Sequence, residues 1–317
     1  MSNPIIRVRE IAWIRLQSPD LDVAEKFLTD FGLQPSVRTD DTLYMRGTDP
    51  DHHIHVTHRG PPKVLSIAFH ADSEADLQRL AKQATGASDV EVINEPGGGK
   101  RVRLTEHNGM GIEVVHGVAE LSPLPVERFR YNTGPSRERL GNLARVTTAP
   151  SHVKRIAHAV ISTPEVKPTV AWIHRHLGFV TSEDVHAEED RNDLLASFNR
   201  LDRGAEYVDH HIMMIGKNPR AGLNHVSFEI QDIDDLWSGH EYLVQQGHEH
   251  CWGIGRHTLG SQIFDYWFDP YGRIHEHWTD SDLLNDEHPY SLLPRSVGLR
   301  SQWGPQAPQA FRDAASR

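Results

Sequence analysis

VLSIAFHADSEADLQRLA, residues 64–81, combines a short apolar run with an acidic cap and a helical apolar pattern. The apolar run is typical of a buried strand, and the spacing of Leu77 and Leu80 is typical of an amphipathic helix. A second segment, LNHVSFEIQDIDDLWSGHEYL at 223–243, has the same order of features. This similarity indicates an internal repeat.

Two other segments begin in the same way and extend the repeat to the whole chain. They start with the apolar runs IAWIRL at 11–16 and IAHAVI at 156–161, and each run precedes a predicted helix and alternating strands. Each half of the chain then ends in a strand beside a glycine turn, NGMGIEVVHG at 108–117 and DPYGRIHEHW at 269–278. We therefore predict an α+β fold of four βαβββ modules that pair into two domains.

The predicted domain boundaries follow changes in composition. Residues 119–151 are rich in Pro, Arg, Ser and Gly and lack apolar periodicity, which is typical of a linker. The remaining predicted units are an N-terminal domain at 1–118, a C-terminal catalytic domain at 152–282 and a tail at 283–317. The tail is irregular but carries Trp303 and Phe311, so we expect it to pack over the C-terminal domain.

Composition excludes several classes of protein. The formal net charge of -11 is spread along 317 residues, and no basic stripe of a nucleic-acid binder is present. No apolar run is long enough for a signal peptide or a membrane span. Cys251 is the only cysteine, which rules out an intramolecular disulfide and a cysteine-rich zinc site. We expect a cytoplasmic protein that binds neither nucleic acid nor membrane.

Alignment of the two halves shows an asymmetry in residues that can bind metal. In the second half, His158 and His225 lie on the first strands of the two modules, and Glu276 lies on the last strand. The equivalent residues of the first half are Trp13, Ser66 and Glu113. A single histidine on an apolar strand is more often a core residue, but this triplet at matched positions predicts a metal site in one concave sheet.

Two histidines and one carboxylate leave three positions of an octahedral ion open. This arrangement suits a non-haem Fe(II) oxygenase, because substrate and O₂ can occupy adjacent positions. A structural zinc site would instead be closed by four protein ligands. Two other histidine clusters, DHH at 51–53 and HEH at 248–250, could bind stray metal, but we predict that they are solvated loop residues. Glu113 is predicted to be a relic or a buried, paired carboxylate.

The sequence resembles the type I extradiol ring-cleaving dioxygenases of the vicinal oxygen chelate superfamily. The resemblance rests on the triad His158, His225 and Glu276 and on GIGRHTLGSQIFDYWFDPYGRIHEHW at 253–278, which is similar to the C-terminal signature of that family. The sequence of this segment is most similar to that of the trihydroxytoluene oxygenase and catechol 2,3-dioxygenase branch. The resemblance implies two vicinal-oxygen-chelate domains, with Fe(II), or alternatively Mn(II), only in the C-terminal domain.

The same resemblance implies roles for residues around the metal. His211 corresponds to an acid–base histidine, with His210 as the alternative because the two neighbours would point to opposite faces of a strand. His257 corresponds to a histidine that contacts substrate or oxygen, and Tyr266 to a tyrosine that hydrogen-bonds a catechol oxygen. Asn224 stands where many relatives have a second histidine. We expect no effect on metal ligation, because neighbouring strand residues face opposite ways, but a change in the surroundings of the site.

The implied reaction is the O₂-dependent cleavage of a di- or trihydroxylated aromatic ring next to its vicinal diol. The implied partners are this aromatic diol and O₂, and the implied assembly is a homo-oligomer, a tetramer or larger. One alternative is a non-oxidative metalloenzyme such as a glyoxalase-like isomerase. Another is a metal-free protein that sequesters a ligand for resistance, which would have no use for His211, His257 and Tyr266 around a triad.

Overall fold

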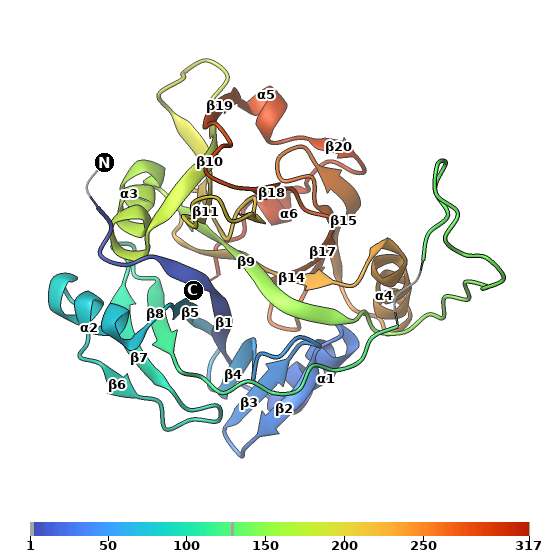
Figure 1. Ribbon diagram of the computed structural model, residues 1–317, viewed down its shortest axis with the longest axis horizontal. Coiled ribbons are helices and arrows are strands. Elements are labelled where there is room, and N and C mark those ends of the chain that lie inside the picture. The colour runs from blue at the N-terminus through green and yellow to red at the C-terminus, as the bar shows by residue number, and fades with distance from the viewer. Residues whose placement is uncertain (1–2, 128–129, 317) are drawn as a thin grey trace.

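The computed structural model describes residues 3–127 and 130–316. The predicted N-terminal domain, linker and tail include residues 1–2, 128–129 and 317, which lie outside this range. Two large sheets make up most of the molecule, one from each half of the chain (Figure 1). The predicted α+β class is confirmed, and each half contains two βαβββ units in sequence.

The N-terminal sheet has eight strands in the order β2-β3-β4-β1-β5-β8-β7-β6. Its two modules meet where β1 pairs with β5 in antiparallel orientation. The strands are β1 (Val8–Ser18), β2 (Gln34–Arg38), β3 (Thr42–Arg46), β4 (His55–Arg59), β5 (Lys63–Ala71), β6 (Glu91–Val92), β7 (Lys100–Thr105) and β8 (Gly111–His116).

The C-terminal sheet repeats this order, with β10-β11-β13-β9 joined to β14-β17-β16-β15 and extended by β19 and β20 at its edges. A separate pair, β12 and β18, lies beside it. The strands are β9 (Val153–Thr163), β10 (Phe179–His186), β11 (Leu194–Leu201), β12 (Val208–Asp209), β13 (Met213–Lys217), β14 (Gly222–Ile230), β15 (His250–His257), β16 (Ile263–Phe268), β17 (Ile274–Thr279), β18 (Leu283–Leu284), β19 (Ser291–Pro294) and β20 (Ser301–Trp303).

One helix follows the first strand of each module, and local signals define its ends. The Asp232 carboxylate caps α4 by accepting a hydrogen bond from the Asp235 amide, and α3 ends at Gly178 in the left-handed conformation. The apolar faces of these helices join the core between the layers. The helices are α1 (Leu21–Asp30), α2 (Glu74–Gln83), α3 (Val166–Leu177) and α4 (Ile233–Gln245), with the short α5 (Arg295–Gly298) and α6 (Gln309–Arg312) in the tail.

Strand register confirms the equivalences expected between the two halves. Ser227 on β14 lies opposite both His158 on β9 and Glu276 on β17. In the first half, Ala68 on β5 lies opposite both Trp13 on β1 and Glu113 on β8. The triad positions are therefore structurally matched across the repeat.

The segment between β8 and β9 has an extended course along the surface, and part of it projects away from the two sheets (Figure 1). Residues 119–127 and 130–151 form no helix or extended strand, only isolated bridges such as Asn132 with Arg137. The tail forms a parallel pairing of β19 with β10 and an antiparallel pairing of β20 with β15. No helix in the described parts of the chain is both long and apolar enough to cross a membrane.

Candidate metal centre

His158, His225 and Glu276 converge at the centre of the C-terminal sheet. Nε2 of His158 lies 3.0 Å from Oε2 of Glu276, and Nε2 of His225 lies 3.4 Å from the same oxygen. One ligand atom from each residue lies within 4.8 Å of the others. All three side chains are buried, because their strands are central in the sheet.

The hydrogen bonding of these atoms fits a metal ion. Nε2 of His225 and both carboxylate oxygens of Glu276 are buried, and within residues 3–127 and 130–316 they have no hydrogen-bond partner of ordinary geometry. Leaving such atoms without a partner is costly, so a ligand is expected at this point. Two ligand atoms at right angles on an octahedral ion, each about 2.1 Å from it, are about 3.0 Å apart, which matches the observed approach.

The charge of Glu276 is also suited to a cation. Burial alone would raise the pKa of the Glu276 carboxyl, but neighbouring His158 and His225 outweigh it and hold that pKa well below its usual range. The carboxylate is therefore ionised at neutral pH. A buried anion with two imidazoles directed toward it is a donor set for a divalent transition metal.

Asn224 orients the histidine that follows it, although regular alternation would place these two side chains on opposite faces of the strand. Its Oδ1 accepts a hydrogen bond from Nδ1 of His225 at 2.7 Å. A register shift between Leu223 and His225 disturbs the regular alternation of β14 at this point, so neighbouring side chains can meet. With its proton on Nδ1, His225 presents the lone pair of Nε2 to the metal position.

His211 lies beside the triad, on the segment between β12 and β13. Its ring centroid is 4.4 Å from that of His158, whereas His210 is directed to Glu183, with Nε2 2.9 Å from Oε2. Nδ1 of His210 and Nδ1 of His211 are 3.1 Å apart, which completes a chain from Glu183 to His211. The structure thus places His211, rather than His210, next to the predicted metal ligands. Burial, and then neighbouring His158 and His210, lower the pKa of His211 well below its ordinary value.

Tyr266 and His257 border the same site from the adjacent strands β16 and β15. The Tyr266 hydroxyl is 2.8 Å from Nε2 of His257, and that nitrogen is 3.8 Å from Oε1 of Glu276. Burial, and then the charge of Glu276, raise the pKa of Tyr266 well above its usual value. Tyr266 therefore keeps its proton and can donate a hydrogen bond.

Comparison with known proteins identifies relatives that extend over nearly the whole chain. Metapyrocatechase 2 of Cupriavidus necator is 27% identical over 314 residues, which is 98% of this chain and 93% of that protein. No family model matches the sequence. The chain is a homologue of the extradiol dioxygenases.

Solved structures similar to this chain include two kinds of enzyme. A Mn(II)-bound glyoxalase from Novosphingobium aromaticivorans has a TM-score of 0.78 and 26% identity, covering 96% of this chain and 94% of that chain. Homoprotocatechuate 2,3-dioxygenase from Arthrobacter globiformis has a TM-score of 0.80 at 20% identity, covering 100% and 94%. The enzyme from Brevibacterium fuscum has a TM-score of 0.81 at 19% identity, covering 100% and 95%. These last two likenesses confirm the predicted two-domain vicinal-oxygen-chelate fold.

The C-terminal tail of this chain packs against the candidate centre. The sequence predicted only that the tail packs over the C-terminal domain. The ring of Phe311 lies 5.6 Å from that of His225 and 4.8 Å from that of Tyr266. The backbone oxygens of Phe311 and Ala314 accept hydrogen bonds from Nδ2 of Asn224. The tail is thus linked to a predicted metal ligand through one amide side chain.

A second group with metal-binding residue types lies elsewhere in the C-terminal half and differs in its hydrogen bonding. His240, His250 and Asp265 approach one another closely. Oδ1 of Asp265 accepts a hydrogen bond from His250, and Oδ2 accepts from both His240 and Trp267. All of these donors satisfy the buried carboxylate, so this group is a structural network. His250 of the HEH cluster is therefore part-buried and paired, not solvated as expected.

Proposed function

We propose that the chain cleaves the ring of a catechol-type aromatic with O₂, next to the vicinal diol, using Fe(II) held by His158, His225 and Glu276. The observation that carries the proposal is the convergence of these buried, unsatisfied ligand atoms beside His211. Homology to metapyrocatechase 2 along nearly the whole chain supports the same reaction class.

When bound, a ferrous ion supplies a Lewis acid that favours ionisation of the diol, together with adjacent open positions for the diol and O₂. The residues of the chain contribute orientation and proton transfer. Asn224 holds His225 through Nδ1, which keeps the Nε2 lone pair available for coordination. Glu276 supplies the negative charge, and burial of the triad excludes bulk water from the centre.

The hydrogen-bond chain at His211 prepares that residue to act as a base. The carboxylate of Glu183 can only accept a hydrogen bond, so Nε2 of His210 carries the proton between them. Nδ1 of a neutral His210 then holds a lone pair and accepts from Nδ1–H of His211. Nε2 of His211 is left without a proton, and it can take one from a substrate hydroxyl and return it later in the reaction.

Tyr266 and His257 form the donor side of the proposed site. Because the raised pKa of Tyr266 keeps its hydroxyl protonated, this hydroxyl can donate to a substrate oxygen that gains charge. Its contact with Nε2 of His257 fixes the orientation of the phenol ring before substrate binds. We therefore assign catalytic roles to His211, Tyr266 and His257, and substrate contact to His257 and Tyr266.

A glyoxalase-like isomerase is the second candidate, because the Mn(II)-bound glyoxalase is 26% identical over 96% of this chain. Such an enzyme moves a proton without consuming O₂. Within residues 3–127 and 130–316, the group at the centre contains only three His, Cys, Asp or Glu side chains, which leaves room for two substrate oxygens and O₂. This favours the dioxygenase over the isomerase.

The direct test is anaerobic reconstitution with Fe(II) or Mn(II), followed by O₂ uptake and visible absorbance with catechol and 3,4-dihydroxyphenylacetate. The proposal predicts that O₂ consumption and a ring-opened product appear together, with more activity for Fe(II) than for Mn(II). Turnover of an α-ketoaldehyde–thiol hemithioacetal without O₂ consumption, and no uptake with any diol, would establish the isomerase instead.

We further propose that the chain assembles as a homo-oligomer, a tetramer or larger, and works in the cytoplasm. The oligomer is supported by the resemblance to extradiol dioxygenases. The cytoplasm is supported by the free thiol of Cys251 and by the reducing conditions that ferrous iron needs. Light scattering of the metal-loaded protein tests the assembly, and a monomer would contradict it.

A further inference from the structure

The N-terminal half contains a copy of the histidine pair that lies beside the metal triad. The sequence Asp-His-His-Ile occurs at 51–54 and again at 209–212. Nδ1 of His52 lies 3.0 Å from Nδ1 of His53, and the corresponding distance for His210 and His211 is 3.1 Å. The internal repeat therefore extends to the proposed acid–base residue, whose counterpart is His53.

The neighbour of His53 has also kept its position, although its chemistry has changed. The ring of Trp13 lies 4.7 Å from that of His53 at an interplanar angle of 45°. In the C-terminal half, the rings of His158 and His211 are 4.4 Å apart at 46°. Trp13 thus stands where a metal ligand stands in the other domain, and its indole offers an N–H donor in place of a lone pair.

Ser66 and Glu113 stand at the other two triad positions of the first half, and both belong to a network of hydrogen bonds and ion pairs. Glu113 accepts hydrogen bonds from Nε of Arg15 at 3.0 Å and from the hydroxyl of Ser66, so it is the buried, paired carboxylate anticipated from the sequence. The guanidinium of Arg15 supplies the positive charge that balances this carboxylate. Glu113 is therefore paired within the protein, and its charge does not require a metal ion for balance.

A cavity of about 200 Å³ lies beside Trp13 and His53. Both side chains are buried, with 1% and 4% of their surface exposed. Nε1 of Trp13 and Nε2 of His53 have no hydrogen-bond partner among the residues that the structure describes. Burial of His53, and then its neighbour His52, lower its pKa to about 3, so the ring is neutral. The expectation that DHH at 51–53 is solvated is therefore wrong for His53, because its ring packs against the rings of Trp13 and Tyr44.

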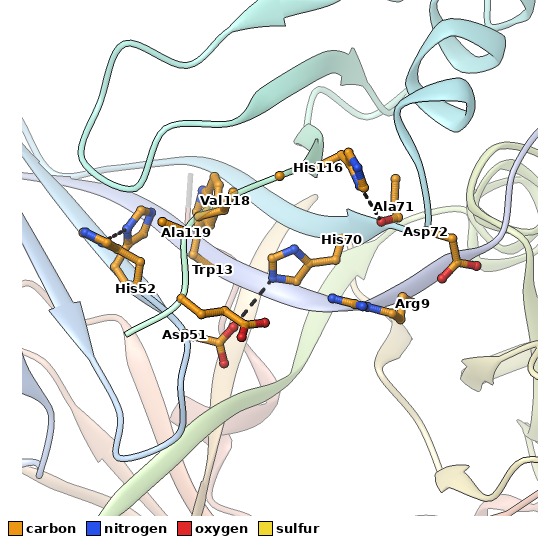
Figure 2. Close-up of a pocket in the computed structure, with 13 residues that line it drawn as sticks. Arg9, Trp13, Asp51, His52, His70, Ala71, Asp72, His116, Val118 and Ala119 are labelled. Carbon is orange, nitrogen blue, oxygen red and sulfur yellow. Dashed lines mark hydrogen bonds and ion pairs between the residues drawn. The ribbon is translucent and has the colours of Figure 1, made fainter. Parts of the chain in front are cut away.

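The described residues that line this cavity include more carboxylates than arginine or lysine side chains. Asp51 and His70 face one another there, with Oδ1 of Asp51 3.8 Å from Nε2 of His70 (Figure 2). Glu120 and Asp72 also line the cavity, and Arg9 is the one arginine or lysine among the described residues of its lining. This balance favours an uncharged ligand over a carboxylate or a phosphate.

We propose that this cavity is a second, metal-free binding site for an uncharged single-ring phenol. A phenolic hydroxyl can accept a hydrogen bond from the Trp13 N–H and donate one to Nε2 of His53, which would satisfy both buried atoms. A cavity of about 150 Å³ holds benzene, so the space observed here accepts one ring with a small substituent. The ring would pack against the indole, as aromatic pairs do. The inference does not depend on ring cleavage at the C-terminal centre.

The test is a titration of the metal-loaded protein with 4-fluorophenol, followed by fluorine NMR, with Trp13→Phe as the key variant. Trp13→Phe keeps the aromatic wall but removes the donor, so affinity at the N-terminal site should fall about fivefold. Trp237→Phe is the matched control, because that residue is exposed on α4, and it should bind as the wild type does. The comparator 4-fluorobenzoate should bind more weakly than the phenol.

A second variant keeps the test decisive if Trp13→Phe does not fold. Ala119 lines the cavity and is exposed, so Ala119→Phe adds bulk at the cavity without altering the core. Loss of 4-fluorophenol binding at this cavity in Ala119→Phe, with metal content unchanged, supports the site. Equal 4-fluorophenol affinity in the wild type, Trp13→Phe and Ala119→Phe would overturn the proposal, as would tighter binding of 4-fluorobenzoate at this cavity.

Discussion

The hydroxyl of Tyr266 lies 2.8 Å from Nε2 of His257, and the two residues belong to adjacent antiparallel strands. Glu276 lies directly opposite Tyr266 on the next strand, so its charge bears on the phenol from the other side. The pKa of Tyr266 is consequently raised by burial and then by that charge. This pairing places a proton donor at the edge of the candidate centre.

Replacing Tyr266 with Phe should slow turnover while leaving the metal in place. The Tyr266 hydroxyl stabilises developing charge by about 3 kcal/mol, so we expect its removal to lower kcat about 100-fold. Metal analysis should still find one ion per chain, because Tyr266 is outside the proposed ligand set. A variant with wild-type kcat would show that the Tyr266 hydroxyl has no role in the reaction.

Glu276→Gln should abolish stoichiometric metal binding, because it removes the only carboxylate of the proposed ligand set. Asp265→Asn is the matched control, since Asp265 is equally buried and also contacts two histidines. This control should lower thermal stability but keep the metal. Loss of metal from Asp265→Asn and its retention in Glu276→Gln would move the centre to the other cluster.

Removal of the Asn224 side chain should weaken metal binding without removing a ligand. In Asn224→Ala, Nδ1 of His225 loses its partner and the tail loses two hydrogen bonds, so we expect metal affinity to fall about 10- to 100-fold. Proteolysis within residues 305–316 should also become faster. Asn224→Asp keeps the acceptor for His225 but cannot donate to the tail. Asn224→Asp should therefore restore more metal affinity than protease resistance, and an equal recovery of both would contradict this separation.

Glu183 should act on the reaction through His210 and His211. In Glu183→Leu the carboxylate that holds the proton on Nε2 of His210 is lost, so the proton arrangement that leaves Nε2 of His211 free is no longer enforced. We expect kcat to fall about tenfold, with a changed pH–rate profile and unchanged metal content. His211→Asn should cost more, about 1000-fold in kcat. If Glu183→Leu changes stability alone and not the pH–rate profile, Glu183 is only a structural residue.

Buried neutral histidines should make the protein sensitive to mild acid. Burial lowers the pKa of His53 to about 3 and that of His55 well below its ordinary value. The unfolded chain binds protons at these residues first, below about pH 6.5. Above that pH both residues are neutral in the folded and the unfolded chain, and no stability is lost. As the pH falls from there toward the folded pKa, only the unfolded chain is protonated, so the free energy of unfolding falls by about 1.4 kcal/mol per pH unit for each group.

Denaturant titrations at several pH values test this linkage. Between about pH 6 and 4, His53→Gln should reduce the slope of unfolding free energy against pH by about 1.4 kcal/mol per pH unit. The exposed residue Trp237, which does not titrate, provides a control, and Trp237→Phe should keep the wild-type slope. Parallel curves for His53→Gln and the wild type would mean that His53 is not protonated during acid unfolding.

Sequence periodicity was sufficient for the modular fold, because strand alternation, helix spacing and glycine turns are local properties of the chain. The triad was predicted as well, since repeat-related positions have the same register: Ser227 pairs with His158 and Glu276 as Ala68 pairs with Trp13 and Glu113. The position of a residue within a repeat can therefore be determined from the sequence alone. The domain boundaries and the chemical roles of the site residues remain predictions.

The contacts around the triad were decided only by the tertiary structure. The irregularity in β14 brings Asn224 to His225, the tail brings Phe311 to the same histidine, and Glu183 reaches His210 from β10. Burial of His53 beside Trp13 likewise depends on how a turn packs against the sheet. Such contacts join residues that are distant in the chain or displaced from regular alternation. Their formation depends on the packing of the whole domain, which no local pattern in the sequence records.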